Sequence, residues 1–133
     1  LSAPTCILEH AADGGQPDYI VRKSRDLTDH MAQNIRRAFE AGVKIAGGSD
    51  AGTPFNYHES YADEVVLMHK MLGMSPQQAL HAATAIAAEL VGLHRGVLEQ
   101  GEPADLLLLE HDIDRDLSAL ARPVAVFKAG ALV

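Results

Sequence analysis

One short segment of the chain places a carboxylate where it could do chemistry. Residues 42–58, GVKIAGGSDAGTPFNYH, begin as an apolar stretch and continue as a glycine-rich loop that carries Asp50. In barrels of parallel strands, the active site lies at the carboxyl ends of the strands. An aspartate at such an end can bind a metal ion and accept a proton from a water molecule on that metal. Asp50 is therefore a candidate for catalysis and for metal binding.

The same aspartate has a simpler interpretation. Aspartate is common after a strand as a turn residue or as the N-cap of a helix, and spacing alone favours that interpretation. Gly47, Gly48 and Gly52 shift the balance toward a site, because glycine lets the backbone come close to a ligand. A phosphate-binding loop is a weak alternative, since the segment has neither the GxGxxG order nor a Lys-Ser pair.

The seven histidines do not form a metal-binding motif by themselves. No pair has HxH or HExxH spacing, and Ala62 stands where the second histidine of an HExxH motif beginning at His58 would be. His58 nevertheless shares the loop with Asp50. It is either a substrate-binding imidazole or a plain loop residue.

Composition limits the classes of partner. The chain has 133 residues, of which 47% are hydrophobic, and a formal net charge of -7 without a basic stripe. We therefore expect a globular body that binds neither nucleic acid nor anionic membranes. No apolar run reaches the roughly 20 residues that cross a bilayer. The single Cys6 cannot form an internal disulfide, which favours a cytoplasmic location.

Hydrophobic spacing predicts alternating strands and helices in the first two thirds of the chain. Strands are expected at 4–8 and 43–46, with an amphipathic helix over 18–41 between them that Gly42 ends. The apolar stripe expected on this helix consists of Ile20, Leu27, Met31, Ile35, Ala38 and Phe39. Strand, helix, strand is the order of a parallel α/β sheet. Further helices are expected over 59–72, with Tyr61, Val65, Met68 and Leu72 on its apolar side, and from a Ser75 capping box to Gly92. The buried stripe expected in the second of these helices consists of Ala79, Leu80, Ala83, Ala87 and Leu90.

The last third changes to short strands and turns. Residues 105–110 form a near-continuous apolar run of strand length, and 124–128 with 131–133 predict a closing hairpin around Ala129 and Gly130. The change in character predicts two units, 1–94 and 95–133.

Several motifs in this order resemble the amidohydrolase superfamily. They are AGVKIAGGSDAGTPF, MSPQQALHAATAIAAELVGL, RGVLEQGEPADLLLLEHD and FKAGALV. Together they cover roughly residues 30–133 and are similar to the C-terminal part of metal-dependent amidohydrolases, closest to the branch with imidazolonepropionase-like enzymes and Xaa-Pro dipeptidases. The implied fold class is α/β: the C-terminal portion of a (β/α)8 TIM-like barrel over 1–94, followed by strands of a small β-sandwich over 95–133.

The resemblance implies roles that spacing cannot supply. Residues 41–49 would form the eighth barrel strand and 4–8 the seventh. Asp50 would match the aspartate that binds the metal and moves a proton to the leaving group in hydrolysis of an amide, either a dipeptide bond or a cyclic amide. A divalent metal, with zinc expected, is the implied cofactor. Thr53 and His58 are our candidates for substrate contacts.

The chain departs from the family pattern in its ligand set. The family's HxH pair, bridging lysine and further histidines would all precede Leu1, and a catalytic zinc takes three protein ligands. We therefore expect a fragment that needs an N-terminal barrel portion as its partner and is inactive alone. Open strand edges could support a homo-oligomer. The alternative is a non-catalytic α/β ligand-binding or interaction module.

Overall fold

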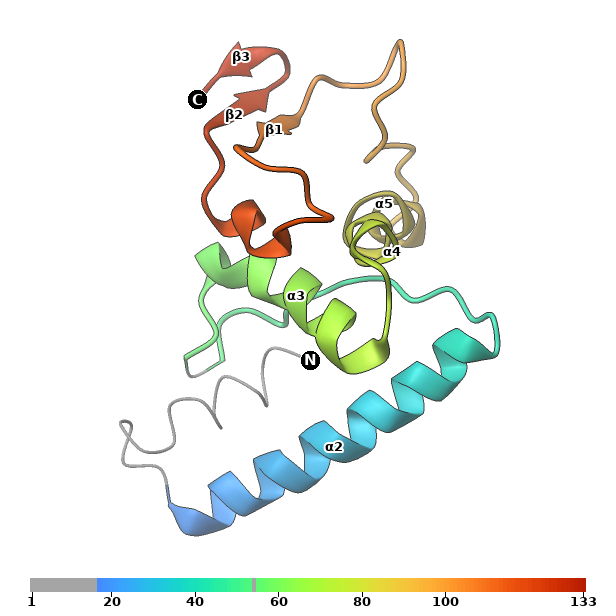
Figure 1. Cartoon of the computed structure of the whole chain (residues 1–133), viewed down its shortest axis with the longest axis vertical. Helices are drawn as coiled ribbons and strands as arrows, with labels where there is room; N and C mark the ends of the chain where they lie inside the picture. Colours follow the sequence, from blue (N-terminus) through green and yellow to red (C-terminus); the bar gives the residue numbers. More distant parts are fainter. Residues whose placement is uncertain (1–16, 54) are drawn as a thin grey trace.

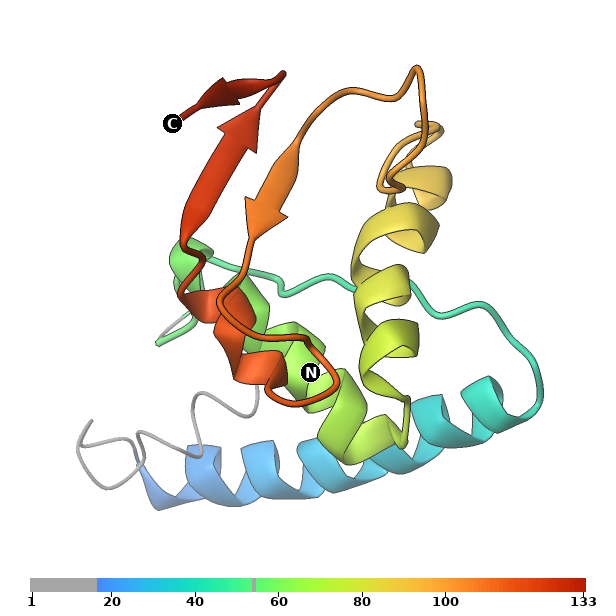
Figure 2. The ribbon, with the colours of Figure 1, turned by 45° about the horizontal axis from the view of Figure 1, so that its top comes forward.

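The computed structural model describes residues 17–53 and 55–133, and its elements form stacked layers (Figure 1). The long helix α2 lies on one side, α3 packs against it, and a short helical turn η3 and a small sheet lie on the opposite side of α3 (Figure 2). The elements are α2 Asp18–Glu40, η1 His58–Ser60, α3 Tyr61–Leu72, α4 Pro76–His81, η2 Ala82–Ile86, α5 Ala87–Leu90, β1 Leu106–Leu108, η3 Leu117–Ala121, β2 Ala125–Lys128 and β3 Ala131–Leu132.

Helix α2 has the predicted extent, but its buried face differs from the predicted one. It runs from Asp18 to Glu40, and Gly42 follows with a φ of 83°, as expected for a glycine that ends a helix. Only the last part of the predicted apolar stripe, Ile35 and Phe39, packs against the core. Leu27 is 47% exposed. The buried residues of the helix are the small Ser24, Thr28 and Ala32.

Helix α3 is the centre of the described core. It contacts α2, α4 and η3, and residues on one of its faces are almost completely buried. The buried cluster consists of Val65, Met68, Leu72, Met74, Ala79, Ala82 and Leu117. The helix ends where predicted, because Gly73 adopts the left-handed conformation that closes a C-terminus.

The next helix begins as predicted and then changes its pitch. Ser75 accepts from the backbone N–H of Gln78, and the side chain of Gln78 accepts from the backbone N–H of Ser75, which completes the capping box. A π-helical turn, η2, then separates α4 from α5. Because a π-turn holds one extra residue, side chains beyond it point in a shifted direction. The predicted stripe is therefore wrong at its end, where Leu90 is 75% exposed.

The predicted parallel sheet does not form among the described residues. Residues 43–46 pair with no described strand, and Val43 is 53% exposed, although Ile45 packs against the core. A parallel strand needs a neighbour to satisfy its backbone groups, and the described part of the chain supplies none. The described sheet is antiparallel and has the order β1-β2-β3.

The predicted hairpin is confirmed, and its turn explains its register. Ala129 and Gly130 have φ values of 50° and 81°, the two positive values that a type I′ turn requires. Phe127 consequently pairs with Leu132 and Lys128 with Ala131. The carboxylate of Asp105 accepts from Lys128 Nζ at 2.6 Å and from the backbone N–H of Ala129 at 2.8 Å.

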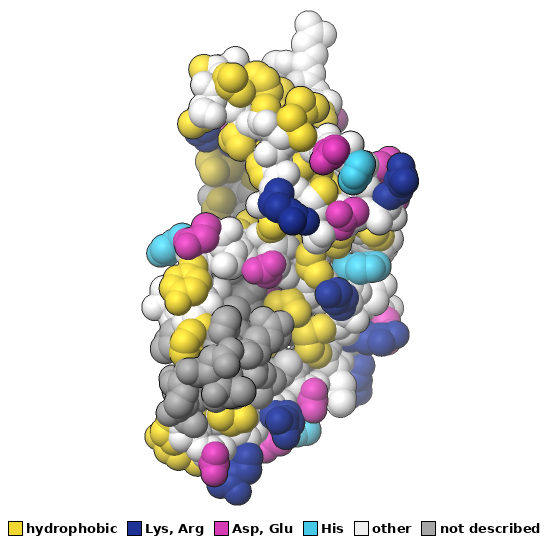
Figure 3. All heavy atoms as spheres, turned by 60° about the vertical axis from the view of Figure 1, so that its left-hand side comes forward, with side chains coloured by type: hydrophobic (Ala, Val, Ile, Leu, Met, Phe, Trp, Pro, Cys, Tyr) yellow, Lys and Arg dark blue, Asp and Glu magenta, His cyan; other side chains and the backbone are white. Residues whose placement is uncertain are grey.

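The apolar run at 105–110 contributes only the short strand β1, and its side chains are exposed. Leu107 and Leu108 are each about half exposed. Other exposed apolar side chains of this sheet are Val124, Val126, Leu132 and Val133. In Figure 3 hydrophobic side chains gather at the upper end of the molecule, where the sheet lies. The predicted strand therefore forms over only three residues, Leu106–Leu108, and no described residue buries their side chains.

Some expectations fall outside the described residues or are not tested by them. The predicted strand at 4–8 and Cys6 lie in the part that is not described. The division into 1–94 and 95–133 stays a prediction. No helix in the described ranges has the length and apolar character needed to cross a membrane.

Candidate active-site loop

The loop at 47–58 is fixed at its start by a contact with the π-turn. The chain leaves α2, passes α4 and α5, and then reaches the beginning of α3 (Figure 2). Here the backbone N–H of Gly47 donates to the carbonyl oxygen of Ala82 at 2.9 Å. A Cβ on Gly47 would lie 3.0 Å from both Ala83 Cα and Met68 Cε. Glycine is needed at this position because the backbone passes directly over the helix and the core.

Tyr61 reinforces the same junction. Its hydroxyl donates to the carbonyl oxygen of Ala83 at 3.2 Å and lies 3.2 Å from where a Gly47 Cβ would be. Burial, and to a smaller extent the charge of Glu64, raise the pKa of Tyr61 above its ordinary value of 10.0. The hydroxyl therefore stays protonated at neutral pH and remains a hydrogen-bond donor.

An exposed ion pair ties the approach to the loop to α5. Lys44 Nζ lies 2.7 Å and 2.9 Å from the two carboxylate oxygens of Glu89. The hydrogen bond and charge of Lys44 lower the pKa of Glu89 below its ordinary value. Both side chains are more than half exposed, so water and salt screen the pair. The ion pair therefore supports the contact between Gly47 and Ala82 but is too weak to hold the start of the loop by itself.

Asn56 holds the loop together from inside. It is 1% exposed, and its Nδ2 donates to the carbonyl oxygens of Ser49 at 2.6 Å and Asp50 at 3.1 Å. Its backbone N–H donates to Thr53 O at 3.0 Å, and its carbonyl accepts from Gly52 N–H at 2.9 Å. One residue thus fixes four others of the same loop.

Asp50 lies at the exposed side of this loop in a constrained conformation. Its φ is 54°, in the left-handed region that few residues other than glycine adopt, although aspartate tolerates it better than most. Its side chain is exposed, while its backbone carbonyl is held by Asn56. The structure therefore presents the carboxylate to solvent from a backbone that is fixed by hydrogen bonds.

The two predicted substrate contacts share one hollow. Thr53 and His58 line an open depression of about 500 Å³, together with Gly52, Phe55, Asn56, Tyr57 and Glu59. His58 is exposed at the start of η1. Thr53 Oγ1 and Asn56 Oδ1 are buried and have no hydrogen-bond partner among the described residues. Asp50 does not line this hollow, so the structure groups two of the three predicted site residues and places the third earlier in the same loop.

The described residues do not form a complete metal site. Nowhere in 17–53 and 55–133 do three histidine, cysteine, aspartate or glutamate side chains come together as a ligand group. Asp50 offers one carboxylate, whereas a catalytic zinc takes three protein ligands. The donor set found here does not fit a catalytic metal without further ligands.

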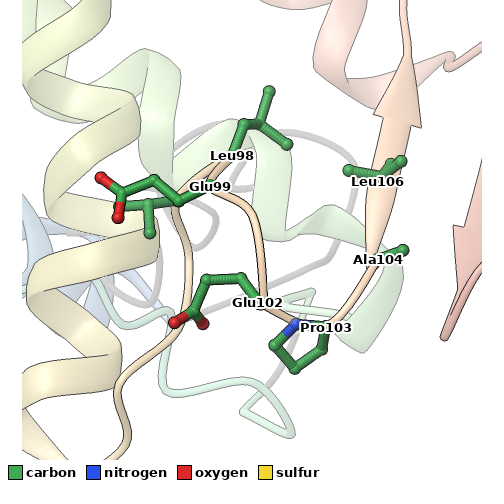
Figure 4. Close-up of a pocket in the computed structure, with 7 residues that line it drawn as sticks. Leu98, Glu99, Glu102, Pro103, Ala104 and Leu106 are labelled. Atoms are coloured by element: carbon green, nitrogen blue, oxygen red, sulfur yellow. The ribbon is translucent and has the colours of Figure 1, made fainter.

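A second hollow lies far from the loop in sequence, next to β1. It has a volume of about 190 Å³ and is lined by Leu98, Glu99, Glu102 and Leu106, among others (Figure 4). A turn with Gly101 at a φ of 100° brings Glu99 and Glu102 to the same hollow. Glu102 Oε2 is buried there without a partner among the described residues. No residue of the 47–58 loop lines it.

Sequence reasoning missed Asn56 and Tyr61. Asn56 stands in the quoted segment, but an asparagine near glycines and proline is usually a turn residue. Tyr61 was expected only to belong to the apolar side of α3. The sequence does contain a signal for Asn56, because an asparagine close to several glycines can donate hydrogen bonds to the backbone carbonyl groups of its own loop.

Comparison with known proteins gives the chain its relatives. The amidohydrolase family matches residues 4–133. An imidazolonepropionase from Deinococcus deserti is 36% identical over 102 residues, which are 74% of this chain and 26% of that protein. The chain thus spans about a quarter of the length of this relative.

Solved structures give the same result. A Bifidobacterium longum protein assigned as a prolidase has a TM-score of 0.89 and 35% identity, over 99% of this chain and 33% of that one. A Xaa-Pro dipeptidase with bound methionine in its active site has a TM-score of 0.82 and 29% identity, over 99% of this chain and 32% of the other. These neighbours fit a TIM-barrel-like α/β fold, of which this chain would be a part.

Sequence and structure agree on one family and one branch within it. The chain belongs to the amidohydrolase family, on the branch of imidazolonepropionase and the Xaa-Pro dipeptidases.

Proposed function

We propose that this chain is the C-terminal portion of a metal-dependent hydrolase of amide bonds, and that Asp50 is its catalytic and metal-binding residue. The observation that carries the proposal is the exposed carboxylate of Asp50 on a loop fixed by Asn56 and by the Gly47 contact with Ala82. Membership of the amidohydrolase family supports it.

The proposed role of Asp50 is to hold and move a proton. Its carboxylate would accept a proton from the attacking water and return it to the departing nitrogen, as a general base and then a general acid. A divalent metal, with zinc as our expectation, would supply Lewis-acid polarisation of the amide carbonyl and a more acidic water. Asp50 would be one ligand, and the remaining ligands would come from the rest of the barrel.

Thr53 and His58 are proposed to contact the substrate. They line the same hollow, and the buried hydroxyl of Thr53 has hydrogen-bonding capacity that no described residue uses. The exposed imidazole of His58 can donate or accept a hydrogen bond. Both side chains suit the polar groups of an amide.

The substrate class follows from the relatives. Imidazolonepropionase and Xaa-Pro dipeptidase are two of the activities named among them, and we propose a C–N bond of a cyclic amide or a dipeptide as the bond that is cut. Because the chain spans about a third of its structural neighbours or less, the activity is proposed for the complete protein. We expect 1–94 to complete the barrel, 95–133 to complete a β-sandwich, and the 133-residue chain to be inactive alone.

The test begins with the nucleotide sequence immediately upstream of the Leu1 codon. The proposal expects a continuous reading frame that encodes an HxH segment. In the complete protein, Asp50→Asn should lower both turnover of amide substrates and bound metal, measured by elemental analysis. The control is Asp29→Asn, which changes an exposed aspartate on α2.

Two results would end the hydrolase proposal. One is an upstream sequence without an HxH segment, and the other is an Asp50→Asn protein with normal turnover. Either result would leave the 47–58 loop as part of the non-catalytic binding module considered above.

A further inference from the structure

We infer that Asn56 is the positioning residue of Asp50. The inference rests on the proposed function, because it assigns the group that aims the proposed catalytic carboxylate. Asn56 is the only asparagine besides Asn34 in the chain, and it is 1% exposed inside the loop.

The two side-chain hydrogen bonds of Asn56 reach both peptide groups that flank Asp50. The carbonyl of Ser49 belongs to the peptide unit before the Cα of Asp50, and the carbonyl of Asp50 belongs to the unit after it. Asn56 Nδ2 donates to these oxygens at 2.6 Å and 3.1 Å. With both peptide planes fixed, the direction of the Asp50 Cα–Cβ bond is fixed as well.

The chemistry of the two acceptors determines how the amide of Asn56 is oriented. Both partners are carbonyl oxygens, so only the NH2 group can face them, and a flipped amide would place three oxygens together. The oxygen of the Asn56 amide consequently points elsewhere and has no partner among the described residues. The side chain is thus used for its donors, which an apolar residue of the same size could not replace.

The backbone of Asp50 needs such support. A φ of 54° is sparsely populated for a residue with a Cβ, and strained backbone persists only where surrounding structure holds it. The backbone of Asn56 adds hydrogen bonds with Thr53 and Gly52. Without the side-chain donors, we expect Asp50 to relax toward other conformations while the rest of the loop stays closed.

The experiment replaces Asn56 with its isosteric acid in the complete protein. Asn56→Asp removes both donors and keeps the volume. Because a small displacement of a catalytic group slows the reaction more than it weakens substrate binding, we expect kcat to fall by about 10- to 100-fold while KM changes by less than about threefold. Hydrogen exchange of peptides covering 47–53 should become faster. Asn34→Asp, which makes the same change on the exposed side of α2, should alter none of these quantities.

A second variant keeps the inference testable if Asn56→Asp does not fold. Asn56→Ser keeps one hydroxyl donor on a shorter side chain, and we expect it to show the same loss of kcat and faster exchange at 47–53. If either folded variant has the kcat of the parent protein, even with a lower melting temperature, Asn56 only stabilises the loop and the inference is wrong.

Asp50→Asn in the same protein distinguishes a failure of the proposed function from a failure of the positioning role of Asn56. An active Asp50→Asn protein contradicts the proposed function itself. An inactive Asp50→Asn protein together with a fully active Asn56→Asp protein contradicts only the positioning role.

Discussion

The backbone N–H of Gly47 donates to the carbonyl oxygen of Ala82 across 2.9 Å and joins the loop that carries Asp50 to a π-turn of the neighbouring helix. A π-turn disturbs the regular hydrogen-bond ladder and is frequently found at functional sites. Here the π-turn supplies the carbonyl group of Ala82, which accepts a hydrogen bond from the loop that carries Asp50. The position of the loop therefore depends on the pitch of a helix that begins almost thirty residues later.

A side chain at Gly47 should break this junction. The added Cβ of Gly47→Ala would lie 3.0 Å from Ala83 Cα, a backbone atom that cannot turn away. We expect a loss of about 1–3 kcal/mol in the free energy of unfolding, measured in urea. The control is the adjacent Gly48→Ala, whose Cβ would have no neighbour within 4 Å and should change stability by less than about 1 kcal/mol. Equal effects at the two positions would contradict the junction.

Gly96 should be even less replaceable, because it packs against the same π-turn and has a positive φ. Its added Cβ would lie 2.7 Å from Ala85 N and from the carbonyl carbon of Thr84, and its φ is 84°. Gly92→Ala isolates the backbone effect, since Gly92 has a φ of 75° and open space around it. We expect Gly92→Ala to cost about 1–2 kcal/mol and Gly96→Ala to cost clearly more, by thermal or urea unfolding. A Gly96→Ala variant as stable as Gly92→Ala would show that the contact relaxes.

The shifted face of the α4–η2–α5 helix can be tested by truncating Leu90, with the core residue Met68 of α3 as the buried reference. Met68 is 1% exposed in the core, and Met68→Ala should lower the free energy of unfolding by about 2–5 kcal/mol. Leu90, which the sequence pattern placed on the buried stripe, is 75% exposed, so Leu90→Ala should stay within about 0.5 kcal/mol of the parent. A large loss at Leu90 would mean that the helix continues without the shift.

Acid should weaken the hairpin through Asp105. The hydrogen bond from Lys128, and then that from the backbone of Ala129, lower the pKa of Asp105 below its ordinary value of 3.8. Because the folded pKa is lower than the unfolded one, the carboxylate stabilises the fold fully above about pH 4, and this contribution is lost as the pH falls through the folded pKa. Asp105→Asn should therefore lower stability at neutral pH and flatten the acid dependence.

The measurement for Asp105 is the unfolding midpoint in urea between about pH 7 and pH 2.5. Lys128→Gln serves as the matched variant, because it removes the charge of Lys128 and its charged hydrogen bond and leaves the backbone hydrogen bond of Ala129 and the charge of Arg95. It should flatten the acid dependence only in part. An Asp105→Asn profile identical to that of the parent would contradict the assignment.

Local sequence signals predicted the helices and the hairpin well. Gly42 and Gly73 end helices because a left-handed residue closes a C-terminus with little strain when it lacks a Cβ. The Ser75 capping box and the turn at Ala129 and Gly130 are equally local. These elements depend on residues within a few positions of one another, so the sequence is enough to locate them.

Predictions that depended on distant partners were less successful. Residues 43–46 have the composition of a buried strand but pair with no described strand, and 105–110 give only a short exposed one. Composition indicates that a segment can be buried, but the neighbours that bury it are distant in sequence. The π-turn at 82–86 was also missed, because apolar spacing assumes a regular helix.

The sequence by itself determined the family and the identity of the candidate residues, because motifs such as GGSDAGTP and the capping box at Ser75 are contiguous in the chain. Only the tertiary structure decided how Asp50 is held. The side-chain amide of Asn56 and the carbonyl of Ala82 act through hydrogen bonds 2.6–3.1 Å long to backbone groups of the loop, and the amino-acid types alone do not specify such contacts. The direction in which a carboxylate points is set by the packing around its backbone, which exists only in the folded chain.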